Sequence, residues 1–190
     1  MMTVGIREAY RRALDDCGVQ VQRVAPGQWW APTPCAGWDV RTLVNHLVGE
    51  SLMVPELMSG RSAAEIGDLF EGDLLGDDPV KAYDVAAAAA VRATEPPDAL
   101  TRTVRLSFGD VSGEEYFTEL FADALIHTWD ISTAIGPEVR LDPELVRLCA
   151  EWFARTEEAY RQTGVIGERP PLPADADPQT RLLAAWGRCG

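Results

Sequence analysis

Long segments with helical periodicity, separated by proline and glycine, are the feature that most constrains the fold of this 190-residue chain. Within them apolar residues recur at spacings of three and four, which places them on one face of an α-helix. The pattern predicts helices over residues 3–22, 39–58, 78–94, 114–135 and 142–163. Amphipathic helices of this length bury their apolar faces against one another, and functional groups then lie between facing helices. We therefore expect an all-α protein, a four-helix bundle with local additions, forming a single domain over residues 1–190.

The segments between the predicted helices have different patterns. Residues 25–38 contain three prolines and three tryptophans, which predicts an irregular loop packed against the body of the protein. Residues 59–78 are rich in Gly, Asp and Glu and are predicted to form a mobile connection. Polar and apolar residues alternate over 103–108 before a Gly-Asp turn at 109–110, which predicts a short strand or β-hairpin. Residues 165–190 are predicted to form an extended C-terminal tail with one short helix around 182–186.

The net charge, the apolar runs and the cysteine spacing limit the partners and the cellular location that we expect. The formal net charge is −13, from 30 acidic and 17 basic residues, so we expect neither nucleic acid nor an anionic membrane surface as a partner. The sequence contains no run of about 18 apolar residues, the length needed to span a membrane. The N-terminal segment also lacks the apolar core of a signal peptide. The four cysteines are too widely spaced for a zinc knuckle or a small disulfide framework. We expect a cytoplasmic protein with reduced thiols.

Acidic residues and one of the two histidines share a stripe of the helix predicted over 114–135. A rotation of about 100° per residue places five side chains on one face, namely Glu115, Glu119, Asp123, His127 and Asp130. The simplest interpretation of such a stripe is a solvated surface. However, His127 is flanked by Ile126 and Trp129, and full solvation of this region would expose large apolar groups.

The stretch DALIHTWDIS, residues 123–132, indicates a metal site. Asp123 precedes His127 by one helical turn, so both side chains can reach the same cation. The second histidine, His46, lies in the helix predicted over 39–58 and would complete a set of two nitrogens and one oxygen. Such a set suits Zn²⁺ first, with Ni²⁺ or Fe²⁺ as alternatives, and leaves a position open for water or substrate. Two simpler interpretations stay open: a core histidine at position 46 that donates to a backbone carbonyl, and a carboxylate–imidazole pair on the surface.

Three blocks of the sequence resemble a known family. They are TPCAGWDVRTLVNHL (33–47), DALIHTWDIS (123–132) and PLPADADPQTRLLAAWGR (171–188). They are similar to actinobacterial proteins grouped with the metal-binding domain of mycothiol-dependent maleylpyruvate isomerase, in the DinB/YfiT-like superfamily. The resemblance spans most of the chain and implies a DinB/YfiT-like four-helix bundle.

The resemblance also implies roles for individual residues. It implies that His46, Asp123 and His127 are the metal ligands. Trp129 and Asp130 recur in the family's signature, where Asp130 would support a ligand or pack the helices rather than bind the metal. For Cys35, in the TPC block, a structural role is favoured over a catalytic one.

The chain departs from the family pattern in two places. The isomerases have glutamate where this chain has Asp123, whose shorter reach would move the metal or change its coordination. They also carry a further C-terminal domain that helps to form the thiol and substrate site, whereas only residues 164–190 follow the last long helix here. The resemblance therefore supports the metal site more strongly than the isomerase activity.

The leading functional hypothesis is a metal-dependent transferase or isomerase that acts with a low-molecular-weight thiol such as mycothiol. A zinc-class ion would favour the thiolate, the reactive form that attacks a small electrophile. Arg41, Arg102 and Arg105 are candidates for binding anionic groups of the substrate.

Three alternatives stay open. One is a metal-dependent hydrolase with Glu50 or Glu119 as the base. Another is a noncatalytic metal-binding or stress-response bundle, and the third is a bundle without metal that acts as a dimerisation module. We also expect that bundles of this kind can form a homodimer through an exposed helix face.

Overall fold

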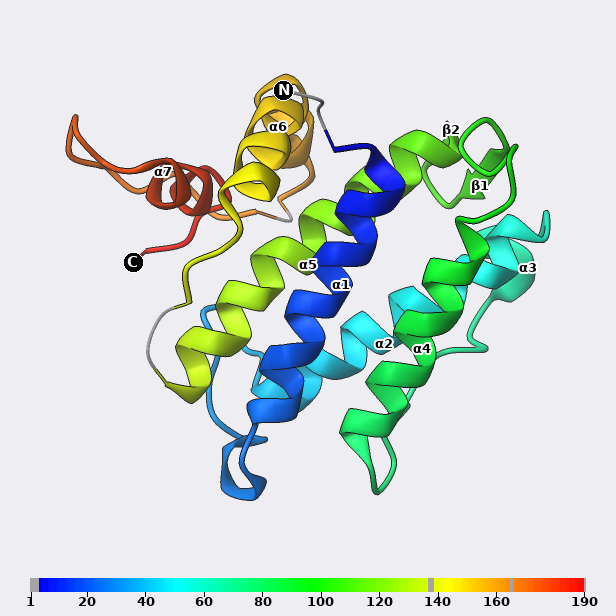
Figure 1. Ribbon diagram of the computed structural model, residues 1–190, viewed down its shortest axis with the longest axis horizontal. Coiled ribbons are helices and arrows are strands. Elements are labelled where there is room, and N and C mark those ends of the chain that lie inside the picture. The colour runs from blue at the N-terminus through cyan, green and yellow to red at the C-terminus, as the bar shows by residue number, and fades with distance from the viewer. Residues whose placement is uncertain (1–3, 137–138, 165, 190) are drawn as a thin grey trace.

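Four long helices form the body of the protein (Figure 1). The computed structural model describes residues 4–136, 139–164 and 166–189. The helices are α1 (Ile6–Arg23), α2 (Val40–Met58), α4 (Pro79–Ala93) and α5 (Gly113–Ile135). α1 packs against α4 and α5, and α2 packs against the same two helices, so the four enclose a common core. The predicted helical fold is confirmed, with helix as 61% of the structure and one two-stranded sheet.

Local capping signals explain why the helix boundaries were predictable. Asp39 and Asp78 each accept a hydrogen bond from a backbone N–H in the first turn of the helix that follows, satisfying a donor that would otherwise lack a partner. Ser112 does the same for α5. Pro79 occupies the first position of α4, where its missing N–H costs nothing. Within the described residues, no helix combines the length and the apolar character needed to cross a membrane.

The predicted β-hairpin is present and leads directly into α5. Strand β1 (Thr103–Leu106) pairs with β2 (Gly109–Ser112) in antiparallel register, with Val104 opposite Val111. The chain then enters α5 at Gly113. A Cβ atom at this position would lie 1.9 Å from the carbonyl oxygen of Ala99, so only glycine fits between the hairpin and the preceding loop.

The prediction of a mobile connection over residues 59–78 was wrong, because this segment has a defined, packed path. It contains the short helix α3 (Ala63–Ile66), which is capped by Ser62 and Glu65. Ile66 and Leu75 are buried in the core. The polar composition concealed this packing because the segment holds only a few buried apolar residues, too far apart to form a periodic pattern.

The loop over residues 25–38 packs against the body only in part. It begins with a short 3-10 helix, η1 (Pro26–Gln28), and the Gln28 side chain donates a hydrogen bond to the carbonyl oxygen of Ile135. Trp29 and Trp38 pack against the core, as predicted, whereas Trp30 is 70% exposed. The end of the loop thereby places Trp38 next to the start of α2.

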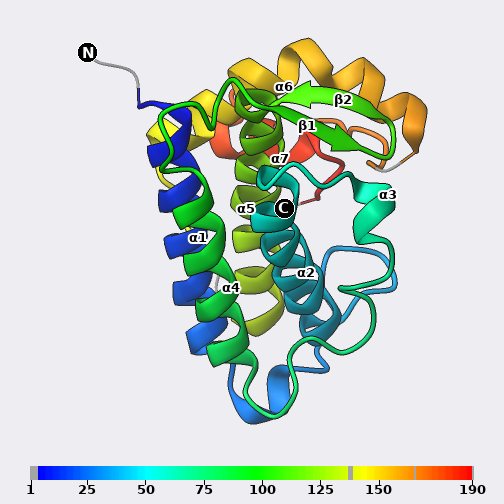
Figure 2. The same cartoon turned by 90° about the vertical axis from the view of Figure 1, so that its right-hand side faces the viewer.

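The C-terminal part of the chain covers one end of the bundle. Helix α6 (Pro143–Thr163) lies across the top of the bundle in Figure 2, and in Figure 1 α6 and α7 (Pro178–Ala185) lie together beside α5. The short helix predicted around residues 182–186 is present but begins earlier, at Pro178, where Asp177 caps it. Trp186 stacks on Phe153 of α6, with ring centroids 4.5 Å apart. This contact fixes the end of the tail on the folded body.

Candidate metal centre

The three predicted metal ligands converge between α2 and α5. Asp123 and His127 lie one turn apart on α5, and His46 faces them from the neighbouring helix α2. The Nε2 atom of His46 is 3.3 Å from Oδ2 of Asp123, and the Nε2 atom of His127 is 3.2 Å from Oδ1 of the same carboxylate. One donor atom from each residue lies within 4.8 Å of the other two.

The spacing and chemistry of these donors fit a zinc-class cation. Two ligand atoms that each lie about 2.0–2.1 Å from a tetrahedral ion are about 3.3–3.4 Å apart. The distances of 3.2 and 3.3 Å, which join the two imidazoles to different oxygens of the Asp123 carboxylate, are close to this spacing. Asp123 therefore reaches between the two imidazoles despite its short side chain.

Charge is concentrated around Asp123. Burial alone would raise the pKa of its carboxyl, but the two histidines that donate to it hold that pKa well below its usual range. Burial likewise opposes protonation of His127, yet Asp123 and Asp130 together raise the pKa of this imidazole well above its usual value. The pKa of His46 is also raised, because its hydrogen bond to Asp123 and the charge of Glu50 outweigh its burial. The cluster thus strongly attracts positive charge.

A second network holds His127 from its other side. Its Nδ1 atom donates to Oδ2 of Asp130 over 2.9 Å, and Asp130 is completely buried. Arg188, from the segment after α7, donates to both oxygens of Asp130 over 3.0 and 2.8 Å. With no ion bound, both ring nitrogens of His127 face carboxylates, Nδ1 that of Asp130 and Nε2 that of Asp123. Because Asp130 holds the proton on Nδ1, loss of the proton on Nε2 would make the Nε2 lone pair available to a cation beside Asp123.

Cys35 belongs to the same network. Its Sγ atom lies 3.2 Å from Oδ2 of Asp130, 3.2 Å from Arg188 and 3.9 Å from Nδ1 of His127. Arg188 was not among the residues predicted from the sequence, and Cys35 was predicted to have a structural role with no stated contact to the site. Arg188 stands in the block ending WGR that supported the family resemblance, and that block was the one signal pointing to it.

Aromatic side chains surround the two histidines. The Trp38 ring lies over His46 with centroids 5.0 Å apart and stacks near His127 at 6.3 Å. The imidazoles of His46 and His127 meet edge to face at 5.4 Å. Trp129, in contrast, is buried in the core, where it packs rather than contributes a donor to the ligand set.

The two candidate bases differ in position. Oε2 of Glu50 is 3.6 Å from Nε2 of His46, and burial together with the charge of Asp123 raises its pKa to about 8. Burial and the nearby carboxylate of Glu115 raise the pKa of Glu119 to about 7. Glu50 therefore lies next to a predicted ligand, His46. Glu119 instead lies near another acid, Glu115, one turn closer to the start of α5.

Comparison with known proteins decides the family. The profile of the mycothiol maleylpyruvate isomerase N-terminal domain matches residues 10–132, well over half of the chain. The chain belongs to this family. The matched region of the family domain includes His46, Asp123, His127, Asp130 and Cys35, whereas Arg188 lies beyond it.

Relatives and solved structures agree with membership of the mycothiol maleylpyruvate isomerase family. Two proteins of Mycobacterium tuberculosis, the uncharacterized proteins Rv0738 (strain ATCC 25618 / H37Rv) and MT0763 (strain CDC 1551 / Oshkosh), are each 32% identical over 95% of this chain and 96% of their own length. The crystal structure of the mycothiol-dependent maleylpyruvate isomerase has the same fold, with a TM-score of 0.64 and 17% identity over 89% of this chain and 77% of that chain. A histidine-to-alanine mutant of that isomerase matches with a TM-score of 0.65 and 16% identity.

The three arginines suggested as anion-binding groups have their contacts elsewhere, outside the two networks that surround His127. Arg41 binds Asp73 and the carbonyl oxygen of Gly76, and Arg102 binds Asp98 and the carbonyl oxygen of Met58. Arg105 is exposed on β1. The first two already hold local structure together.

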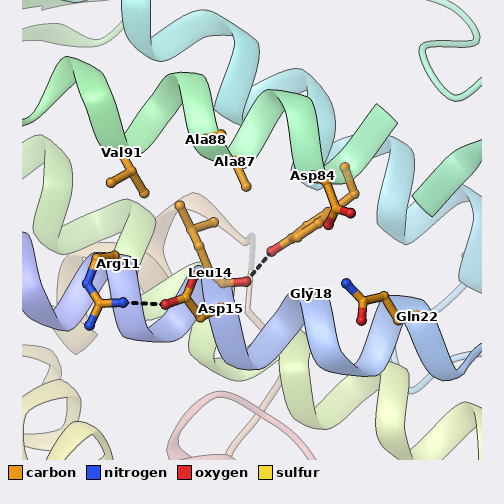
Figure 3. A pocket seen from close by; sticks show the side chains of 10 residues that line it. Arg11, Leu14, Asp15, Gly18, Gln22, Asp84, Ala87, Ala88 and Val91 are labelled. Atoms are coloured by element: carbon orange, nitrogen blue, oxygen red, sulfur yellow. Dashed lines mark hydrogen bonds and ion pairs between the residues drawn. The ribbon is translucent and has the colours of Figure 1, made fainter. Parts of the chain in front are cut away.

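A groove runs between α1 and α4, with Arg11 and Asp15 on one side and Ala87 on the other (Figure 3). Its volume is about 360 Å³, and its lining residues include neither histidine nor cysteine. A Cβ atom at Gly18 would approach the ring of Tyr83 to 3.2 Å, so a small residue here lets the two helices come close. The groove therefore reflects helix packing rather than an extension of the metal centre.

Proposed function

We propose that this protein is a divalent-metal enzyme that activates a low-molecular-weight thiol, mycothiol, for transfer to a small electrophile or for its isomerisation. The observation that carries the proposal is the convergence of His46, Asp123 and His127 on one point between α2 and α5. Support comes from the family, which is named for mycothiol and maleylpyruvate, and from the fold shared with an isomerase described as mycothiol-dependent.

The role of the cation is to supply positive charge that lowers the pKa of an approaching thiol. The surrounding residues then hold this centre in one geometry. Asp130 keeps the proton of His127 on Nδ1 and so directs Nε2 toward the ion. Trp38 covers the two imidazoles and keeps water from that side of the centre.

Glu50 is the best-placed residue to accept the thiol proton. It is partly exposed and lies within 3.6 Å of His46, so a substrate at the ion would come within reach of its carboxylate. Without an ion, burial and the charge of Asp123 raise its pKa to about 8. A cation bound at His46 and Asp123 would lower that pKa and favour the carboxylate form, which accepts a proton. Proton transfer to Glu50 would leave the thiolate free to attack the electrophile.

Elemental analysis of the purified protein tests the metal site. We expect about one divalent ion per chain, and its loss in the His127→Ala variant. Glu56→Ala is a matched control, because Glu56 lies on α2 and pairs with Arg61 away from the ligands. Equal, near-zero metal in the wild type and in His127→Ala would overturn the proposal and favour a bundle without metal.

A thiol-transfer assay before and after chelation tests the catalytic role. If the ion is catalytic, chelation stops the transfer of mycothiol to an electrophile such as maleylpyruvate, while the helical circular dichroism signal persists. If the ion is structural, chelation melts the bundle, and that result would contradict a catalytic role.

A further inference from the structure

The imidazole of His127 lies between two groups of potential metal ligands. On the Nε2 side are His46 and Asp123, the ligand set of the proposed function. On the Nδ1 side are Cys35 and Asp130. In each group, donor atoms from three residues lie within 4.8 Å of one another. A neutral imidazole has one free lone pair, so His127 can serve one of these groups at a time.

The second group has the dimensions of a metal site. Oδ2 of Asp130 lies 2.9 Å from Nδ1 of His127 and 3.2 Å from Sγ of Cys35, and the sulfur–nitrogen distance is 3.9 Å. Around a tetrahedral zinc ion with bonds of about 2.3 Å to sulfur and 2.0–2.1 Å to nitrogen and oxygen, the corresponding distances are about 3.3–3.6 Å. The residues thus need only small side-chain movements to bind an ion through sulfur, nitrogen and oxygen.

Arg188 occupies this second group with its guanidinium. Its Nη2 atom lies 2.8 Å from Oδ2 of the Asp130 carboxylate and 3.2 Å from Sγ of Cys35. The chain turns at Gly187 with φ of 75°, next to Gly167, and Arg188 also donates to the carbonyl oxygen of Trp186. The tail therefore holds a positive charge where a second cation position would be.

We infer that Cys35, His127 and Asp130 form a second, thiolate-containing metal position that the guanidinium of Arg188 keeps closed. This inference rests on the proposed function, because it concerns where the ion of that function binds. With Arg188 in place, Asp130 is neutralised, His127 offers Nε2, and the ion binds with His46 and Asp123. Without Arg188, the second group offers two anionic ligands, Cys35 and Asp130, against one in the first group, and draws the ion to itself.

The exchange of position is balanced in protons. Binding at the second group requires the Cys35 thiol to lose its proton to solvent. The His127 ring loses the proton on Nδ1 and gains one on Nε2, so it stays neutral. For Cys35 and His127 together the change is one proton released, and His46, which the ion leaves, regains a free lone pair that can take up a proton. No oxidant or reductant is involved.

Absorption spectroscopy with one equivalent of Co²⁺ tests the inference. Cobalt bound to a thiolate gives a sulfur-to-metal charge-transfer band in the near ultraviolet, which nitrogen and oxygen ligands do not give. We expect no such band in the wild type, a clear band in Arg188→Met, and its loss in the double variant Arg188→Met with Cys35→Ser. Arg188→Lys keeps the positive charge and should behave as the wild type does.

A second variant covers the case in which Arg188→Met fails to fold. A chain ending at Gly187 removes Arg188 and the exposed Cys189 together, and should show the same band. Bound Co²⁺ without the band in these variants, or an equal band in the wild type, would overturn the inference. Failure of the wild type to bind Co²⁺ would instead count against the proposed function, so the two failures are distinguishable.

Discussion

The completely buried carboxylate of Asp130 accepts a hydrogen bond from Nδ1 of His127 over 2.9 Å, on the side of the ring opposite Asp123. Metal-binding histidines commonly donate their second N–H to a carboxylate in this way, which fixes the tautomer and the ring orientation. The relationship makes Asp130 a positioning residue for the proposed metal centre.

Replacing Asp130 should weaken metal binding without removing a ligand. We expect Asp130→Asn to lower the affinity for Zn²⁺ by about 10- to 100-fold, because the amide holds the His127 tautomer less firmly. Competition with a chromophoric chelator measures the change. Asp98→Asn, at an exposed aspartate that pairs with Arg102, is the matched control and should leave the affinity unchanged. Equal affinities of both variants and the wild type would argue against this role of Asp130.

Two variants test whether metal binding requires a carboxylate at position 123 and whether a longer acidic side chain can replace Asp123. Asp123→Asn removes the negative ligand and should abolish stoichiometric metal binding. Asp123→Glu keeps the carboxylate on a longer side chain, and should retain about one ion per chain. Metal content by elemental analysis separates the two variants. Full metal content in Asp123→Asn would show that the carboxylate is not a ligand.

Metal binding should weaken as the pH falls. The pKa values of His46 and His127 are both raised in the absence of an ion. Protons therefore begin to compete with the metal at a pH above about 6.5, the usual pKa of histidine. We expect the apparent dissociation constant to rise steadily from pH 8 to pH 5.5, with up to two protons taken up per ion released. Titrations at a series of pH values measure this slope. A constant affinity across this range would rule out histidine ligands.

The sequence predicted the fold and the Asp123–His127 pair because their signals are local, whereas His46 was added as the second histidine of the chain and through the family resemblance. The helix ends follow from caps such as Asp39 and Asp78, which act within one turn. Asp123 and His127 meet because they are one turn apart on the same helix. The contact between Asp130 and Arg188 spans 58 positions and depends on how the tail crosses the bundle, so no periodicity could reveal it. The path of residues 59–78 was missed because its buried apolar residues, such as Ile66 and Leu75, are too far apart to form a periodic pattern.

Glu119 should make the metal-free protein less stable as the pH rises. Its pKa in the folded state is raised to about 7 by burial and by Glu115, so the folded state binds more protons than the unfolded chain between about pH 4.5 and 7. The free energy of unfolding therefore falls across this window. Glu119→Gln should remove the penalty and raise stability at pH 8 by about 1–2 kcal/mol, allowing for partial exposure of the carboxyl.

Urea unfolding of chelated wild type and Glu119→Gln, at pH 5 and pH 8, measures this effect. Glu50 also titrates near pH 8 and is present in both proteins, so the difference between them isolates Glu119. Glu95→Gln, at an exposed acid in the turn after α4, is the control and should not change the pH dependence. A variant that follows the wild-type pH profile would show that Glu119 is ionised and solvated throughout.

Gly113 links the stability of the fold to the geometry of the metal centre. It is the first residue of α5, which carries Asp123 and His127, and an added Cβ atom would lie 1.9 Å from the backbone oxygen of Ala99. Because the obstructing atom belongs to the backbone, it cannot rotate away, and Gly113→Ala should cost about 2–3 kcal/mol of unfolding free energy. Gly27→Ala, where a Cβ atom would meet no heavy atom within 4 Å, should change stability by less than about 0.5 kcal/mol. Thermal unfolding should then show a transition about 5–10 °C lower for Gly113→Ala alone, and equal transitions for both variants would contradict the close approach.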